Sequence, residues 1–229
     1  MENNNQECCN HMQLPLIGED APKFTAVTTN GVMNFPDDYK GKWVVFFSHP
    51  ADFTPVCTTE FMTFARMENE FKELNAELVG LSVDGLHAHI EWIKSMKDIE
   101  LRGVKGAEVK FPVIVDISME VSKKYGMIQP MQSTTSAVRA VFVIDPNGKI
   151  RTILYYPQEL GRNFSEIKRI LQGLQKSDQL KCALPADWQP GEDVIVPPAR
   201  TLEIANAREA GKDGDMRCEK WFLCYKKDQ

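Results

Sequence analysis

Residues 43–60 read WVVFFSHPADFTPVCTTE, and this stretch decides the fold of the chain. The apolar run at residues 43–47 predicts a buried strand, and a helical pattern begins at Thr58. Cys57 therefore belongs to the first turn of that helix, where unpaired N–H groups and the helix dipole favour a thiolate over a thiol.

An inert thiol packed in the core is the ordinary alternative for a free cysteine such as Cys57. Its position between a strand and a helix favours an activated thiol instead. Pro50 and Pro55 fix the approach of the chain to the helix. Thr54 and His49 stand close by in the sequence as polar partners. We therefore take Cys57 as the candidate nucleophile.

The composition is that of an ordinary water-soluble protein. The chain has 229 residues, of which 43% are hydrophobic and 26% charged, so it can bury a full core. A formal net charge of −5 argues against nucleic acid and anionic membranes as partners. No apolar run approaches the roughly 18 residues that span a bilayer, and the N-terminus lacks a signal-peptide pattern. We expect a cytoplasmic protein without a nucleic-acid or membrane partner.

The cysteines are Cys8, Cys9, Cys57, Cys182, Cys218 and Cys224. In a reducing compartment, redox, metal-binding or inert roles are more common than a static disulfide framework. Cys8, Cys9 and His11 supply at most three ligands, so a mobile N-terminal tail is favoured over a zinc or iron site. His87 and His89 point apart on a helix, which favours a solvated His87 and a packed His89 over a metal pair. We expect no metal and no other cofactor.

The segments around Cys57 predict an α/β fold. Asn30-Gly31 between two extended pieces predicts a hairpin. A helix with an aromatic stripe runs to about Leu74 and a strand follows at residues 77–84, which makes residues 43–83 a βαβ unit with a parallel strand pair. A second amphipathic helix is expected at residues 86–97.

Further along the chain, apolar runs at residues 138–144 and 149–156 flank a turn and predict a second hairpin. Arg139 enters the first of these strands. It is either solvated at the strand start or buried beside apolar neighbours, and a buried arginine needs an anion. A thiolate is such an anion.

The C-terminal part begins with a helix and then changes in texture. Asn163 and Glu166 form the pattern of a capping box for that helix. After Leu180, prolines and glycines interrupt every periodic pattern, yet Trp188, Trp221 and their neighbours are too apolar for a disordered tail. An arm that lies across a partner subunit satisfies both observations.

The pattern Pro50-x-x-x-Thr54-x-x-Cys57, followed much later by Arg139, resembles the peroxiredoxin signature. The chain also resembles members of that family at residues 42–60, 125–127, 141–146 and 161–164. The likeness is to the long-tailed, one-cysteine subclass, and it spans roughly residues 14–225.

This resemblance implies a thioredoxin fold with peroxiredoxin insertions: a central mixed sheet flanked by helices, plus a C-terminal arm. In that family the thiolate at the position of Cys57 attacks the O–O bond of a peroxide. Thr54 and Arg139 would bind the peroxide, and Pro50 would shield the site from water. Such an attack needs groups that stabilise the leaving oxygen.

The resemblance also implies supporting residues. Glu60 and Arg162 would hold Arg139 in place. His49 matches a histidine typical of the subclass, and its role is left open. Some members carry a lipase-like serine before the strand, but Lys42 stands at that position, so we expect no phospholipase activity.

The sulfenic acid formed on Cys57 needs a resolving thiol. Cys218 and Cys224 in the arm are similar to the paired tail cysteines of archaeal-type members, in which the second one bridges to the partner subunit. Cys224 is therefore assigned as resolving. Cys218 is a relay or fallback, or else a packing thiol beside Trp221. Cys182 is read as structural.

Three segments are expected: a flexible tail at residues 1–13, a thioredoxin-like peroxidase domain at 14–176, and an arm at 177–229. The function expected is a thiol-dependent reduction of hydrogen peroxide and organic hydroperoxides, recycled by a thioredoxin-like reductant. The expected assembly is a homodimer, and a decamer built as a pentamer of dimers. The alternatives are a ring-forming holdase chaperone, a peroxide sensor or a metal-binding protein.

Overall fold

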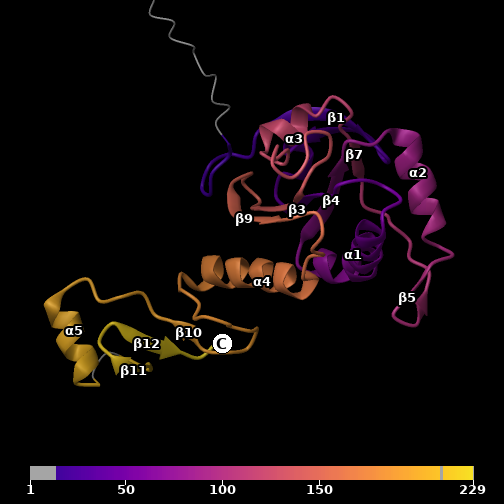
Figure 1. Cartoon of the computed structure of the whole chain (residues 1–229). Helices are drawn as coiled ribbons and strands as arrows, with labels where there is room; N and C mark the ends of the chain where they lie inside the picture. Colours follow the sequence, from indigo (N-terminus) through magenta and orange to yellow (C-terminus); the bar gives the residue numbers. More distant parts are fainter. Residues whose placement is uncertain (1–13, 212–213, 229) are drawn as a thin grey trace, which may run out of the picture. The chain divides into compact units, whose positions relative to one another are not determined.

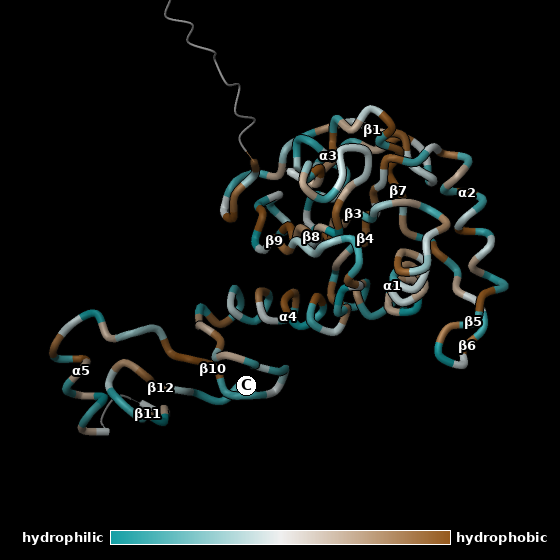
Figure 2. Tube along the Cα trace, viewed as in Figure 1, coloured by the Kyte–Doolittle hydropathy of each residue, from teal (hydrophilic) through white to brown (hydrophobic). Residues whose placement is uncertain are grey.

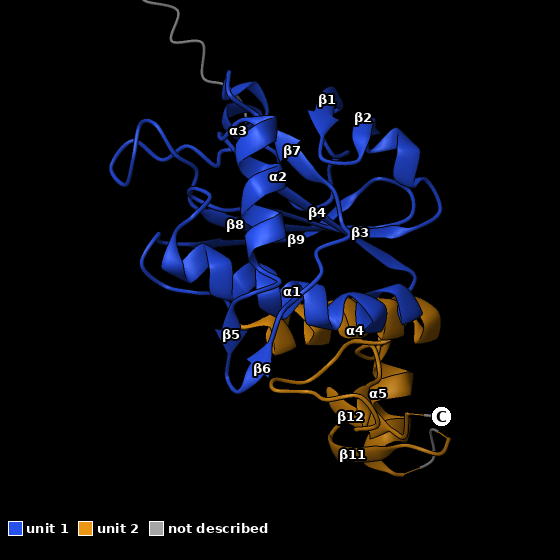
Figure 3. Ribbon diagram, turned by 90° about the vertical axis from the view of Figure 1, so that its right-hand side faces the viewer, with its two compact units in different colours: residues 1–162 blue, residues 163–229 orange. Residues whose placement is uncertain are grey.

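The computed structural model describes residues 14–211 and 214–228. The chain forms two compact units, residues 1–162 and 163–229, which Figure 3 distinguishes by colour. The expected tail at residues 1–13, with Cys8, Cys9 and His11, lies outside the described residues. Each unit is described below by itself.

The first unit is built on a seven-stranded sheet with the strand order β2-β1-β7-β4-β3-β8-β9 (Figure 1). Its strands are β1 (Phe24–Thr28), β2 (Gly31–Phe35), β3 (Trp43–Ser48), β4 (Ala76–Ser82), β7 (Val113–Val115), β8 (Arg139–Ile144) and β9 (Ile150–Tyr156). The pairs β3–β4 and β4–β7 are parallel, whereas the other neighbours are antiparallel. The predicted central mixed sheet, the parallel pair and both hairpins are confirmed.

The helical elements of this unit are η1 (Asp37–Tyr39), α1 (Pro55–Glu73), α2 (Leu86–Ser95) and α3 (Glu120–Lys124). A small hairpin of β5 (Glu100–Leu101) and β6 (Val104–Lys105) follows α2. Helix α1 begins at Pro55, earlier than the predicted start at Thr58. The reason is that the fixed φ of proline suits the first helical position, where no N–H is needed. Cys57 is still within the first turn.

Strand β3 is apolar and buried along its whole length, as expected for a central strand of a sheet that is covered on both faces. Phe46 packs against the aromatic group Phe24, Phe35, Tyr125 and Phe142 on one face of the sheet, in tilted and edge-to-face contacts. Phe47 points to the other face and packs against Phe61 and Phe64 of α1. Figure 2 shows the hydrophobic colouring of these central strands. This packing fixes α1, and therefore Cys57, against the carboxyl end of β3.

The second unit contains α4 (Phe164–Leu180), α5 (Leu202–Glu209) and a three-stranded sheet. The sheet has the order β10-β12-β11, with β10 at Val194–Ile195, β11 at Arg217–Lys220 and β12 at Leu223–Lys226. The Asn163 side chain accepts a hydrogen bond from the Glu166 amide, so the predicted cap is present. The Glu166 carboxylate binds Arg169.

Helix α5 and the small sheet were not anticipated from the sequence. Each element has no more than eight residues, and such short runs between prolines and glycines carry little periodic signal. Among the described residues, no helix is both long and apolar enough to cross a membrane.

Candidate active site

Cys57 lies buried in the first turn of α1, and the first residue of β8 reaches it from the opposite side. Arg139 Nη1 is 3.3 Å from Cys57 Sγ. The rest of the Arg139 guanidinium is fixed by hydrogen bonds from Nε and Nη2 to the Gln158 carbonyl oxygen, at 2.9 and 2.6 Å. A positive, directional donor therefore faces the thiol in an interior where charge interactions are strong.

Glu60 lies one helical turn after Cys57 and joins two arginines. Its Oε2 accepts hydrogen bonds from Arg139 Nη1 at 2.8 Å and from Arg162 Nη2 at 2.6 Å. Its Oε1 accepts from the Arg162 backbone N and from Arg162 Nε, at 2.8 and 2.9 Å. Arg162 Nη1 reaches the carbonyl oxygens of Ser48 and Ala140. The guanidinium of Arg162 thereby ties α1 to the ends of β3 and β8.

The charge of this cluster is set by the two arginines. Burial alone raises the pKa of the Glu60 carboxyl, but the charge and hydrogen bonds of Arg162, followed by the charge of Arg139, hold it below its ordinary value. Glu60 is only 1% exposed. It is therefore an ionised carboxylate in the protein interior. Arg162 neutralises its charge, so part of the positive charge of Arg139 is left directed at Cys57.

The loop between β3 and α1 carries the other predicted residues. Pro50 is buried and Thr54 is half-buried. The Thr54 hydroxyl donates to the Ala51 carbonyl oxygen at 2.8 Å instead of capping α1. The Thr54 carbonyl oxygen accepts from the Thr58 backbone N and hydroxyl. Thr54 is thus held within its own loop, next to the first turn that contains Cys57.

His49 directly follows β3 and belongs to a second buried group. Its Nε2 lies 2.8 Å from Asp52 Oδ1, and His89 Nδ1 lies 2.7 Å from Asp52 Oδ2. Burial lowers the pKa of His49, although Asp52 opposes this. His89 is buried and His87 is exposed, as predicted. His49, Asp52 and His89 are the described residues that come close enough together to offer three metal ligands. Their facing atoms are at hydrogen-bond distances, so we read them as a hydrogen-bonded cluster.

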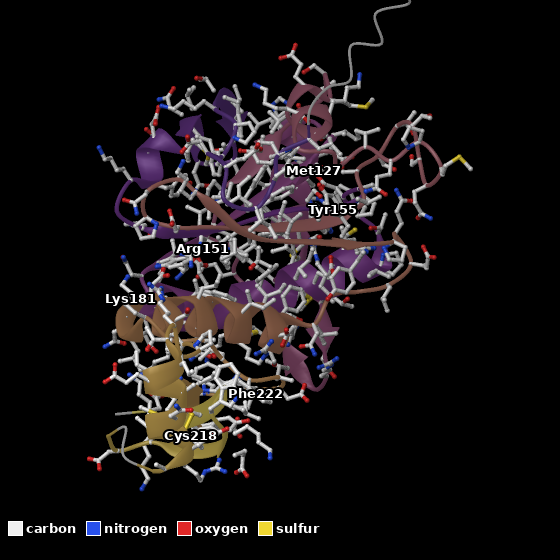
Figure 4. The ribbon with its side chains drawn as sticks, turned by 90° about the vertical axis from the view of Figure 1, so that its left-hand side faces the viewer. Met127, Arg151, Tyr155, Lys181, Cys218 and Phe222 are labelled. Carbon is white, nitrogen blue, oxygen red and sulfur yellow. A yellow bond between two sulfur atoms is a disulfide. The ribbon has the colours of Figure 1, made fainter. Side chains whose placement is uncertain are left out.

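The tail cysteines lie in the second unit. Cys218 in β11 and Cys224 in β12 stand opposite each other and are joined by a disulfide (Figure 4). Cys224 is buried. Cys182 is a buried free thiol, and burial raises its pKa, in keeping with an unreactive packing role.

Sequence reasoning missed three contributors: Gln158, Asp52 and His89. Gln158 acts through its backbone carbonyl, which has no sequence signal. Asp52 lies three residues after His49 and was a visible candidate. His89 reaches Asp52 from α2, and only the packing of α2 brings the two residues together.

A sheet of this kind, with a buried cysteine–arginine pair at the start of a helix that follows a central strand, defines the class of thiol-dependent peroxidases with a thioredoxin fold. Residues 17–153 match the AhpC/TSA family, and residues 173–211 match the C-terminal domain of 1-Cys peroxiredoxin. The chain belongs to the AhpC/TSA family and is a peroxiredoxin-type peroxidase.

Two relatives illustrate the similarity. A protein of Methanosarcina mazei named peroxiredoxin is 62% identical over 216 residues, covering 94% of this chain and 99% of its own. A protein of Thermotoga petrophila with the same name is 51% identical over 219 residues, covering 94% and 98%.

Solved structures agree in fold. A yeast mitochondrial 1-Cys peroxiredoxin has a TM-score of 0.81 and 40% identity, covering 94% of this chain and all of that one. A cysteine mutant of peroxiredoxin 6 from Arenicola marina also has a TM-score of 0.81, at 38% identity, covering 93% and 98%. The predicted thioredoxin fold is confirmed.

Proposed function

We propose that this peroxidase reduces hydrogen peroxide and organic hydroperoxides through Cys57. The observation that carries the proposal is the 3.3 Å contact between Arg139 Nη1 and Cys57 Sγ, with Arg139 held by Glu60. The thiolate is the nucleophilic form of cysteine. A fixed guanidinium beside it favours that form and also stabilises an oxygen that gains negative charge.

The reaction has a simple balance. The Cys57 thiolate attacks the terminal peroxide oxygen, so an S–O bond forms as the O–O bond breaks. Sulfur is oxidised to a sulfenic acid, and the leaving hydroxide or alkoxide takes up a proton to give water or an alcohol. Arg139 and the unpaired backbone N–H groups of the first turn of α1 stabilise the leaving oxygen.

Thr54 is proposed to orient the peroxide. Because its hydroxyl hydrogen is directed to the Ala51 carbonyl, the Thr54 oxygen is left to accept a hydrogen bond from the peroxide O–H. Pro50 keeps water away from the thiol. Glu60 and Arg162 hold Arg139. His49 holds Asp52 of the loop by a hydrogen bond.

Cys224 is proposed to resolve the sulfenic acid, from the partner subunit of a dimer. Its thiol condenses with the Cys57 sulfenic acid, which gives a Cys57–Cys224 disulfide and releases water. Cys218 then attacks Cys224 and sets Cys57 free as a thiol. The disulfide between Cys218 and Cys224 supports this relay, because it is the product of that exchange.

A thioredoxin-like dithiol is proposed to reduce the Cys218–Cys224 disulfide. The yeast relative is described as acting through glutathione and thioredoxin systems, which supports a thiol donor here. The proposed assembly is a homodimer, with dimers closing into a decamer as a pentamer of dimers. The proposed location is the cytoplasm.

The test is peroxide turnover coupled to NADPH through thioredoxin and thioredoxin reductase. The parent protein is expected to turn over, and Cys57→Ser is expected to lose all activity. A Cys182→Ser variant is the matched control and should keep the parent rate. Turnover that survives in Cys57→Ser would overturn the assignment.

A further inference from the structure

The loop that carries Pro50 and Thr54 is anchored chiefly through Asp52. The Asp52 side chain receives His49 and His89 on its two oxygens. Its backbone N donates to Asp84 Oδ2 at 3.0 Å, and the Ser82 hydroxyl holds the same oxygen of Asp84 at 2.6 Å. One residue thus ties the loop to α2 and to the end of β4.

The donor and acceptor positions determine where the protons lie. His89 Nδ1 faces Asp52 Oδ2 at 2.7 Å, and His89 Nε2 faces the Ile114 carbonyl oxygen at 3.2 Å. A carbonyl oxygen only accepts, so His89 Nε2 carries a proton. Either His89 Nδ1 carries one too, which makes the ring an imidazolium, or Asp52 is protonated. In both cases one proton lies between His89 Nδ1 and Asp52 Oδ2.

Asp52 is the acceptor in this hydrogen bond. Burial raises the pKa of the Asp52 carboxyl, but hydrogen bonds from His49 and His89 outweigh burial and hold that pKa below its ordinary value. Asp52 therefore has a histidine nitrogen at hydrogen-bond distance from each of its two oxygens. His49 then donates from Nε2, and its Nδ1 is buried without a hydrogen-bond partner among the described residues. Asp84 is a second carboxylate near His49, and its charge raises the pKa of His49.

Burial and aromatic packing make the hydrogen-bonded pair of Asp52 and His89 costly to disturb. The side chains of His49, Asp52 and His89 are 0%, 1% and 0% exposed. The His49 ring stacks on Trp92 at a centroid distance of 5.0 Å and meets Phe61 at 4.6 Å. A buried carboxylate that loses a hydrogen-bond partner is strongly unfavourable, so the loop moves or takes up water when His89 is changed.

We infer that Asp52 and His89 are positioning residues of the peroxidase site: the hydrogen bond between them holds the Pro50–Thr54 loop so that Thr54 faces a peroxide bound at Cys57. The inference rests on the proposed roles of Thr54 and Cys57. His89 itself is assigned no contact with the peroxide, because its ring nitrogens are both occupied by Asp52 and Ile114.

The first test compares two reactions of the same thiol. We would measure the rate constant of Cys57 with hydrogen peroxide by stopped flow, and its alkylation by iodoacetamide by peptide mass spectrometry. Alkylation needs the thiolate but no oriented peroxide. The variants are His89→Gln and Asp52→Asn, and the matched control is His87→Gln, since His87 is exposed on the same helix.

In His89→Gln and Asp52→Asn, the peroxide rate is expected to fall about tenfold to a hundredfold, because small misplacements of an orienting group cost that much. Alkylation is expected to stay equal or become faster, and His87→Gln should match the parent in both reactions. The inference is overturned by unchanged peroxide rates, or by peroxide and alkylation rates that fall in parallel. A parent that reduces no peroxide through Cys57 instead contradicts the proposed function.

The second test needs no activity and no change at Asp52 or His89. In the parent protein, the proton between His89 Nδ1 and Asp52 Oδ2 should give an NMR signal that exchanges slowly with water, because both side chains are buried. His49 should show one protonated and one bare ring nitrogen. The His87→Gln spectrum identifies the exposed ring. The absence of such a signal would overturn the hydrogen bond between Asp52 and His89.

Discussion

Glu60 is the residue on which the geometry around Cys57 depends. It is a carboxylate in the core, and such a group is tolerated only when its charge and lone pairs are fully matched. Arg162 and Arg139 provide that match. The same hydrogen bonds that make Glu60 stable also fix the angle at which Arg139 meets the thiol.

The first prediction follows for Glu60→Gln. The neutral amide leaves two buried guanidinium groups without their anion, so the free energy of unfolding should fall by about 3 kcal/mol. Arg139 is expected to shift, and the peroxide rate constant should fall at least about tenfold. Urea unfolding and stopped flow measure these quantities.

The control is Glu73→Gln, an exposed position on the same helix. It should change the free energy of unfolding by less than about 0.5 kcal/mol. Equal effects at Glu60 and Glu73 would contradict the role given to Glu60.

A second prediction concerns acid. Because the pKa of Glu60 is lowered in the folded state, its contribution to stability is complete above its ordinary value of 4.5 and is lost as the pH falls from there through the folded-state value. Between about pH 5 and about pH 3, the parent should therefore lose more unfolding free energy than Glu60→Gln. Urea curves across this range measure the difference, and parallel curves for the two proteins would contradict it.

At the scale of elements, a strand, a loop and a helix place the thiol. β3 is fixed by apolar packing on both faces, and Pro55 fixes the start of α1. The sequence predicted these elements because apolar runs and proline positions are local signals. It misplaced the helix start by a few residues. The hydrogen bond between Asp52 of the loop and His89 could not be predicted, since it depends on the packing of α2 beside the loop.

The third prediction concerns α4. Asn163 caps this helix by accepting from the Glu166 amide, so Asn163→Ala should destabilise its first turn by about 1 kcal/mol. Hydrogen exchange of the first-turn amides is then expected to become about fivefold faster. Ser165→Ala, at an exposed position of the same turn, is the control. Unchanged exchange in Asn163→Ala would show that the cap contributes nothing.

At the scale of the whole molecule, the proposed reaction cycle joins cysteines from two units of the chain. Cys57 lies in the first unit, and the Cys218–Cys224 disulfide lies in the second. The positions of the cysteines in the sequence do not decide which tail cysteine would react with Cys57. The disulfide adds that the two tail thiols can exchange with each other, which the proposed relay requires.

The fourth prediction tests this relay. Fully reduced protein is treated with one equivalent of peroxide and run on a non-reducing gel. Cys218→Ser should accumulate a covalent dimer, because the Cys57–Cys224 disulfide has no thiol to release it. Cys224→Ser should stay monomeric, and Cys182→Ser should behave like the parent. If Cys224→Ser forms the dimer and Cys218→Ser does not, the two roles are reversed.

The sequence by itself predicted the candidate nucleophile, and it determined the place of Cys57 in the first turn of a helix, the mixed sheet and the family. These depend on local patterns: an apolar strand, a proline-bounded loop and the spacing of Pro50, Thr54 and Cys57. Only the tertiary structure decided how charge is balanced in the interior. Glu60 with its two arginines, and Asp52 with His89, are matched across distant segments, because a buried ion is stable only where folding brings its partners.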